Sequence, residues 1–88
     1  MNMTTTINIE TLYNFIDLIQ VCIKDLQNSN DHLFKLIRYG YADGILQTIS
    51  GLGLINNKQY GYIHDCIMNK VNIDGDVLGN FDNFKDGE

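Results

Sequence analysis

Two histidines and two cysteines are the residues of this chain that most readily suggest metal chemistry, because thiolate and imidazole are the usual ligands of zinc. Their order along the chain is Cys22, His32, His64 and Cys66, and no two of them form the closely spaced pair of a structural zinc site. His64 and Cys66 are two positions apart, so on a helix they point to nearly opposite sides. We therefore predict no metal and no cofactor. We expect the histidines to lie at the surface and the two cysteines to be buried, reduced thiols.

Nucleophilic catalysis is suggested by the run His64-Asp65-Cys66, which contains a base, a carboxylate and a nucleophile. Consecutive residues of one helix point in different directions, so these three side chains cannot form a triad. The sequence also lacks a phosphate-binding glycine loop with its lysine, and it lacks a Gly-x-Ser-x-Gly motif. We predict that the protein is not an enzyme.

A calcium loop is suggested by the alternating oxygen ligands of Asn72, Asp74 and Asp76. The glycine that such a loop needs at its sixth position is replaced by Val77, and the glutamate of its last position is replaced by Asn83. The pattern therefore predicts no calcium site.

The net charge of -5 is concentrated at the C-terminus. Residues 1–71 contain six acidic and five basic side chains, whereas residues 72–88 contain five acidic side chains and one basic one. Such an end repels nucleic acid and favours a basic protein surface. The acidic segment also contains apolar side chains, so we predict partner contacts in it at Asp74, Asp76, Phe81, Asp82 and Phe84.

Apolar periodicity predicts a first amphipathic helix from about residue 9 to residue 27, with Asn8 as its N-cap. Gln20 falls on the polar side, while Leu18 and Val21 lie off the main stripe and suggest a second contact surface. The predicted apolar arc consists of Leu12, Phe15, Ile16, Ile19, Cys22, Ile23 and Leu26.

A polar cluster at residues 28–31 predicts a short turn, so the second helix, about 31–52, should fold back antiparallel to the first. Gly40, Gly44 and Gly51 flank its apolar face, and each interior glycine costs roughly 1 kcal/mol relative to alanine. We predict close packing of another helix on these glycines; a kink near residues 40–44 and a backbone-lined ligand groove are the alternatives. The predicted apolar face consists of Phe34, Ile37, Tyr41, Ile45, Ile49 and Leu52.

A third helix is predicted from about residue 57 to residue 71. Gly53 suits the left-handed position after a helix end, and Asn56 followed by Gln59 matches a capping box. Periodicity is lost after the third helix, which predicts a helical domain over residues 1–72 and a mobile acidic tail over residues 73–88. The predicted apolar side of the third helix consists of Tyr60, Ile63, Ile67 and Val71.

The predicted fold is all-α: an antiparallel helical hairpin, completed by a third shorter helix into a small three-helix bundle with a flexible acidic tail. An 88-residue chain buries a modest core, so we expect a homodimer. Tyr39 and Tyr62 are predicted to point away from the core, and their aromatic side chains suit a partner interface.

These features favour a small non-enzymatic protein that binds, and thereby regulates or inhibits, a protein partner with a basic surface. Isoleucine and asparagine are 23 of the 88 residues, which is typical of an AT-rich genome. Small acidic helical proteins of such genomes are often phage proteins, so an inhibitor of the anti-defence or anti-CRISPR type is one version. The alternative is a dimeric transcriptional or structural accessory protein that contacts DNA.

The start of the chain, Met1-Asn2-Met3, has no basic segment followed by an apolar one, and no apolar run is long enough to span a bilayer. We therefore expect a cytoplasmic protein with no membrane contact. The acidic C-terminus and the lack of a basic patch predict no direct contact with nucleic acid.

Overall fold

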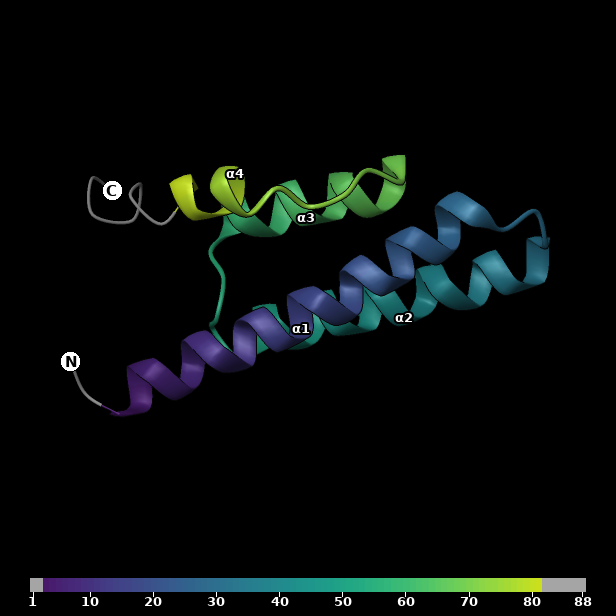
Figure 1. Ribbon diagram of the computed structural model, residues 1–88. Helices are drawn as coiled ribbons and strands as arrows, with labels where there is room; N and C mark the ends of the chain where they lie inside the picture. The colour runs from purple at the N-terminus through teal and green to yellow at the C-terminus, as the bar shows by residue number, and fades with distance from the viewer. Residues whose placement is uncertain (1–2, 82–88) are drawn as a thin grey trace.

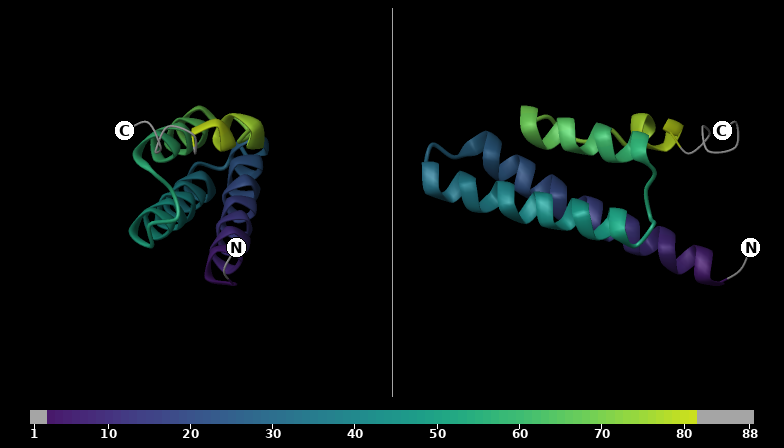
Figure 2. Two further views of the ribbon diagram at one scale, coloured as in Figure 1. Left: turned by 90° about the vertical axis from the view of Figure 1, so that its left-hand side faces the viewer. Right: turned by 180° about the vertical axis from the view of Figure 1, so that it is seen from behind.

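The computed structural model describes residues 3–81, with side chains from residue 9 onward. Four helices follow one another, and no strand occurs among these residues (Figure 1). Seen end-on, the first three helices surround a common interior and the short fourth helix lies beside the third (Figure 2). The all-α prediction, with an antiparallel hairpin and a shorter third helix, is confirmed. The helices are α1 (Met3–Asn28), α2 (His32–Gly51), α3 (Asn57–Asn69) and α4 (Gly75–Asn80).

The hairpin of α1 and α2 forms the larger part of the structure. Asp31 caps α2, because its Oδ1 accepts a hydrogen bond from the Phe34 backbone N–H at 2.9 Å. This cap lies in the polar cluster at residues 28–31, where the sequence predicts a short turn. The N-cap predicted at Asn8 is wrong, since α1 begins at Met3 and Asn8 lies inside the helix.

The core lies between α1, α2 and α3. On α1 the buried side chains all belong to the predicted arc, and the other two members of that arc, Leu12 and Phe15, pack partly buried against the core. The predicted apolar arc of α1 is therefore confirmed. The buried core residues are Ile16, Ile19, Cys22, Ile23, Leu26, Ala42, Leu46, Ile49, Ile63, Cys66, Ile67, Ile73 and Leu78.

On α2 the predicted apolar face is only partly correct, because the buried side is rotated by about one residue. Of the predicted residues, Ile49 is buried and Ile45 packs partly buried against the core. Ala42, Leu46 and Ile49 are buried, whereas Ile37 and Tyr41 are 49% and 58% exposed. Apolar residues occur on both sides of this helix, so periodicity alone does not select the buried side. The observed side places small Ala42 at the contact, where the bulky Tyr41 would hold the helices apart.

An ion pair accompanies this orientation of α2. Arg38 Nε lies 3.2 Å from Asp25 Oδ2 on α1, and the guanidinium carbon lies 4.9 Å from the ring centre of Phe34 and 5.5 Å from that of Tyr41. The Arg38–Asp25 pair therefore joins the two helices along one flank of the core. The α-helix is continuous from His32 to Gly51, so it is not broken at Gly40 or Gly44.

The start of α3 forms as predicted. Gly53 has a φ of +74°, and the Leu54 N–H donates to the Ile49 carbonyl at 3.0 Å, which closes the end of α2. Asn56 and Gln59 form the expected capping box. The helix ends at Asn69 because Lys70 is left-handed.

Val71 is consequently outside α3 and half-exposed, so its predicted place on the apolar side of that helix is wrong. The periodic pattern did not reveal that the helix stops before this residue.

Residues 73–81 belong to the folded body, and their assignment to a mobile tail is wrong. Ile73 and Leu78 are only 6% and 3% exposed, and Asp74 caps α4 by accepting a hydrogen bond from the Asp76 N–H at 2.8 Å. Ile73 and Leu78 therefore anchor this segment on the core. The remaining part of the predicted tail, residues 82–88, lies outside the described residues.

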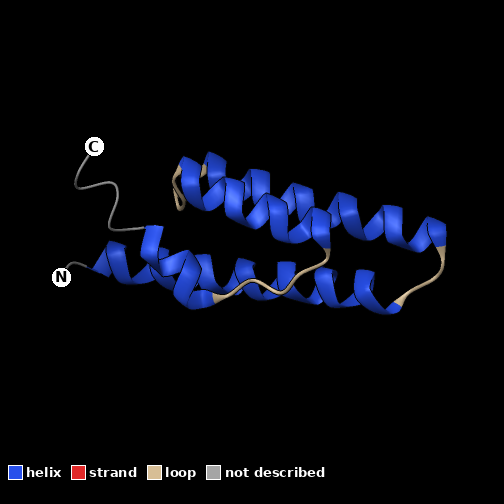
Figure 3. Cartoon of the chain, turned by 90° about the horizontal axis from the view of Figure 1, so that it is seen from above, coloured by secondary structure: helices blue, strands red, loops and turns tan. Residues whose placement is uncertain are grey.

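Glutamine side chains hold the connection between α3 and α4, which runs back along α1 (Figure 3). Gln20 Nε2 donates to the Ile73 carbonyl at 2.8 Å, and Gln20 Oε1 accepts from the Ile73 N–H at 2.9 Å. Gln27 Nε2 donates to the Lys70 carbonyl at 2.8 Å. A non-helical backbone that crosses a core needs such partners. Gln20 therefore has a structural role, although the sequence places it on the polar side of α1.

We predict that Leu78→Ala lowers the free energy of unfolding by about 2–5 kcal/mol, because it empties a buried site. Leu18→Ala is the matched control, since Leu18 is half-exposed on α1 and should change stability by about 0.5 kcal/mol or less. Urea unfolding followed by circular dichroism measures both. Equal, near-zero effects would contradict the packing of residues 73–81.

Candidate interaction surface

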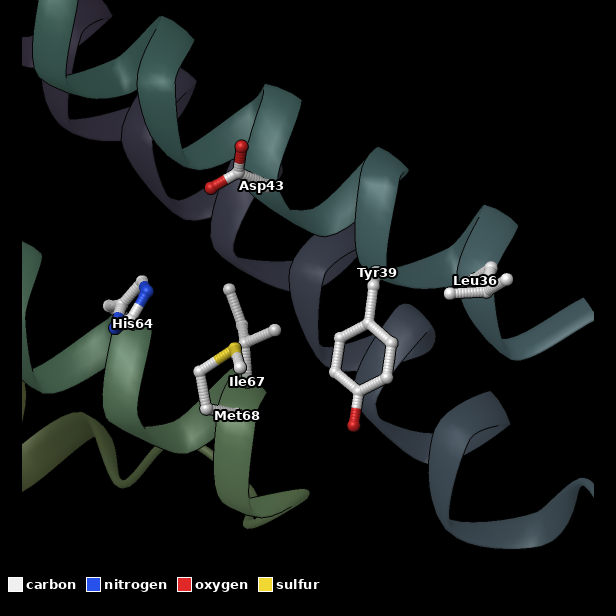
Figure 4. A pocket seen from close by; sticks show the side chains of 6 residues that line it. All are labelled: Leu36, Tyr39, Asp43, His64, Ile67 and Met68. Carbon is white, nitrogen blue, oxygen red and sulfur yellow. The ribbon is translucent and has the colours of Figure 1, made fainter. Parts of the chain in front are cut away.

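A groove with a cavity volume of about 250 Å³ lies between α2 and α3 (Figure 4). Each helix contributes three side chains from one edge, because residues three or four positions apart lie on the same side of a helix. The lining residues are Leu36, Tyr39, Asp43, His64, Ile67 and Met68.

The floor of the groove is apolar and its rim is accessible. Ile67 is buried, Tyr39 packs partly buried against the core, and Leu36 and Met68 are more than half exposed. Asp43 from α2 and His64 from α3 lie toward one end of the groove, with Leu36 at the other (Figure 4). The groove can therefore bury an apolar group and offer a carboxylate beside it.

Asp43 has no ion-pair partner within 4.0 Å among the described residues. His64 Nδ1 instead lies 3.9 Å from Asp65 Oδ1, and its ring is nearly parallel to that of Tyr60, with 6.3 Å between the ring centres. An exposed carboxylate beside an apolar floor gains most from a cation that a bound molecule brings with it.

A second exposed surface is the side of α2 that faces away from the core, here named the outer face. It consists of Leu33, Ile37, Gly40, Tyr41 and Gly44. Leu33 is 68% exposed, so with Ile37 and Tyr41 it forms a line of large apolar side chains spaced four residues apart. Contiguous exposed apolar surface of this kind marks interaction sites.

The glycines of α2 have open space around them. Outside the glycine's own helix, no described part of the chain comes within 4 Å of a Cβ placed on Gly40, Gly44 or Gly51. The predicted close helix packing on these glycines therefore does not occur within the described chain. It stays a prediction for contact with a second molecule. The predicted backbone-lined groove is not formed here either, since the groove lining contains none of the three.

Tyr39 and Tyr62 face different parts of the molecule. Tyr39 turns into the groove, and Tyr41, predicted to be buried, is the exposed one. The Tyr62 hydroxyl accepts a hydrogen bond from the Asp74 N–H at 2.8 Å, and its ring lies 5.8 Å from that of Phe81 between ring centres. Tyr62 thus supports α4, and the prediction that both tyrosines point away from the core is wrong.

Of the partner-contact residues predicted in the acidic segment, two make contacts within the chain, one is exposed and two are not described. Asp74 is the cap of α4, and Phe81 contacts Tyr62 while its carbonyl accepts from Asn56 Nδ2 at 3.1 Å. Asp76 is exposed in the first turn of α4. Asp82 and Phe84 lie outside the described residues.

Both cysteines are free and buried, as predicted. Burial raises the pKa of the Cys22 thiol and of the Cys66 thiol, which keeps both neutral and weakly nucleophilic. Within residues 3–81, no three side chains of His, Cys, Asp or Glu gather closely enough to hold a metal ion.

Leu36, Asp43, His64 and Met68 were not singled out from the sequence as groove residues. Leu36 and Met68 are apolar residues off the predicted apolar sides of their helices, and that property was the available signal. Their meeting across two helices depends on how α3 packs on α2, which periodicity does not specify.

Comparison of this chain with protein-family models, curated proteins and solved structures finds no match. None of the helices within residues 3–81 combines the length and hydropathy required to span a membrane.

We predict that Gly44→Ala raises the free energy of unfolding of the dilute protein by about 1 kcal/mol, because alanine favours the helix and its Cβ meets open space. Gly53→Ala is the control in the opposite direction, since a left-handed alanine costs about 1–2 kcal/mol. Chemical unfolding measures both. Destabilisation by Gly44→Ala would contradict the open outer face.

Proposed function

We propose that this chain is a non-enzymatic protein-binding protein that regulates or inhibits its partner by receiving an apolar side chain in the groove between α2 and α3. The observation that carries the proposal is the groove itself, which is open, has an apolar floor and has Asp43 at one end. Concave apolar sites with a few placed polar groups are the usual form of a binding site.

The partner segment is a large apolar residue next to a lysine or arginine. A cation beside the bound side chain would pair with Asp43, which has no ion-pair partner among the described residues. The net charge of -5 adds long-range attraction for a basic surface and repulsion of nucleic acid.

One biological version is a cytoplasmic, phage-encoded inhibitor of the anti-defence or anti-CRISPR type, which covers a basic surface that otherwise meets nucleic acid. Its support is the small size, the acidity and the composition of the chain. The DNA-contacting accessory protein is the less favoured alternative. Arg38, one of five basic residues before residue 72, is already paired with Asp25 and stacked beside Phe34.

Selection of random peptides on the immobilised protein tests the groove directly. We expect enrichment of peptides in which a large apolar residue adjoins lysine or arginine. Asp43→Asn should weaken the best peptide about tenfold, which is roughly 1.4 kcal/mol. Fluorescence polarisation measures the affinity, and Asp17→Asn is the matched control, because Asp17 is an exposed carboxylate on α1, outside the groove, and should have little effect.

Met68→Glu should abolish peptide binding without unfolding the chain, since Met68 is exposed at the rim. Enrichment of acidic peptides, or equal binding to the Asp43→Asn variant, would contradict the proposal. Measuring the binding of the protein to bulk DNA at a series of salt concentrations distinguishes this proposal from the DNA-contacting alternative. The binding protein should show no association, whereas a steep salt-dependent affinity would favour the accessory protein.

A further inference from the structure

We infer that a second copy of this chain docks on the outer face of α2, so that two α2 helices pack across a two-fold axis with Gly40 and Gly44 at their closest approach. This interface uses Leu33, Ile37 and Tyr41, none of which lines the groove. It is therefore a different surface from the proposed partner site.

The exposed side chains provide the apolar part of the contact. Leu33, Ile37 and Tyr41 occupy successive turns on one side of α2 and are all about half exposed or more. Nothing in the described chain covers them, since α1 and α3 both pack against the opposite side of the helix, which carries Ala42, Leu46 and Ile49. Covering the stripe removes apolar surface from water, which favours association.

The glycines determine how closely a second helix can come. Each costs the isolated helix roughly 1 kcal/mol relative to alanine, and no packing within the described chain explains that cost. A helix crossing at Gly40 and Gly44 would meet backbone instead of side chains. Thr48, one turn further on, donates its hydroxyl to the Gly44 carbonyl at 2.8 Å, so its donor is already satisfied within its own helix.

The absence of charge on the outer face suits a second copy as the occupant. A two-fold axis places the same patch of both molecules in contact, so a charged patch would repel its own copy. The outer face contains no charged residue. Of the charged residues nearest to it, Arg38 is paired with Asp25 and Asp43 lines the groove. For a chain with a net charge of -5, an uncharged face is the one on which two copies can meet with least repulsion.

The area limits the strength of the contact. The outer face extends over residues 33–44, which is about 18 Å of a helix about 10 Å wide, so the contact buries on the order of 200 Å² per partner. Standard stable interfaces bury about 800 Å² per partner. The dimer should therefore be weak and should form and dissociate with concentration.

Sedimentation velocity of the 88-residue chain over a concentration series tests the interface. The wild-type protein should shift from monomer toward dimer as its concentration rises. Gly40→Ala with Gly44→Ala should raise the dimer dissociation constant about tenfold while raising the melting temperature, because the added Cβ atoms favour the helix but separate the two copies. A higher melting temperature together with weaker dimerisation would show that the dimer is not lost through unfolding of the variant.

Ile37→Lys places two like charges across the axis and should give a monomer throughout the series. Ile9→Lys is the matched control, because Ile9 is the same residue type with a similar exposure, 46% against 49%, but lies on α1, and it should dimerise as the wild type does. A wild-type monomer at every concentration would overturn the inference. A dimer that is weakened neither by Gly40→Ala with Gly44→Ala nor by Ile37→Lys would also overturn the inference. The same holds if these variants weaken only the binding of peptides. Peptide binding in the groove is measured separately with Asp43→Asn, so either proposal can fail alone.

Discussion

The rotation of α2 about its own axis is the constraint on which the rest of the structure depends. This helix is apolar on two sides, and only one of them can face α1 and α3. Burial of Ala42, Leu46 and Ile49 turns Tyr39 toward the groove and turns Ile37 and Tyr41 outward. The Arg38–Asp25 pair on the flank is compatible with this rotation. Successive residues differ by about 100 degrees, so a rotation of α2 by one residue would bring Tyr41 to the position toward the core that Ala42 occupies.

The shorter helices complete the core that the hairpin leaves open. The capping box of Asn56 and Gln59 starts α3, and Ile63, Cys66 and Ile67 then close one side of the hairpin. The chain returns along α1 through two hydrogen bonds between the Gln20 amide and the Ile73 backbone. Leu78 follows and is buried. A chain of 88 residues can form only a modest core. Residues 73–81 add Ile73 and Leu78 to it, so the core is larger than the first three helices alone would give.

Features set by local chemistry could be predicted from the sequence. The cap at Asp31, the capping box at Asn56 and the left-handed Gly53 depend on neighbouring residues only, and the arc of α1 has a single apolar side. The buried side of α2 could not be predicted, because two apolar sides compete and packing decides between them. Ile73 and Leu78 lie in a polar segment without periodicity, so their burial depends on partners distant in the sequence, such as Gln20. The groove pairs Asp43 with His64 and Met68 only through the packing of α3 on α2.

Two surfaces of one helix are proposed to have separate roles: the flank that carries Asp43 would receive a partner, and the outer face would receive a second copy. Both depend on the orientation of α2, which hydroxyl-radical footprinting of the dilute protein measures directly. Our account predicts strong labelling at Leu33, Ile37 and Tyr41 and protection at Leu46 and Ile49. Protection of Ile37 and Tyr41 together with labelling of Leu46 would contradict it.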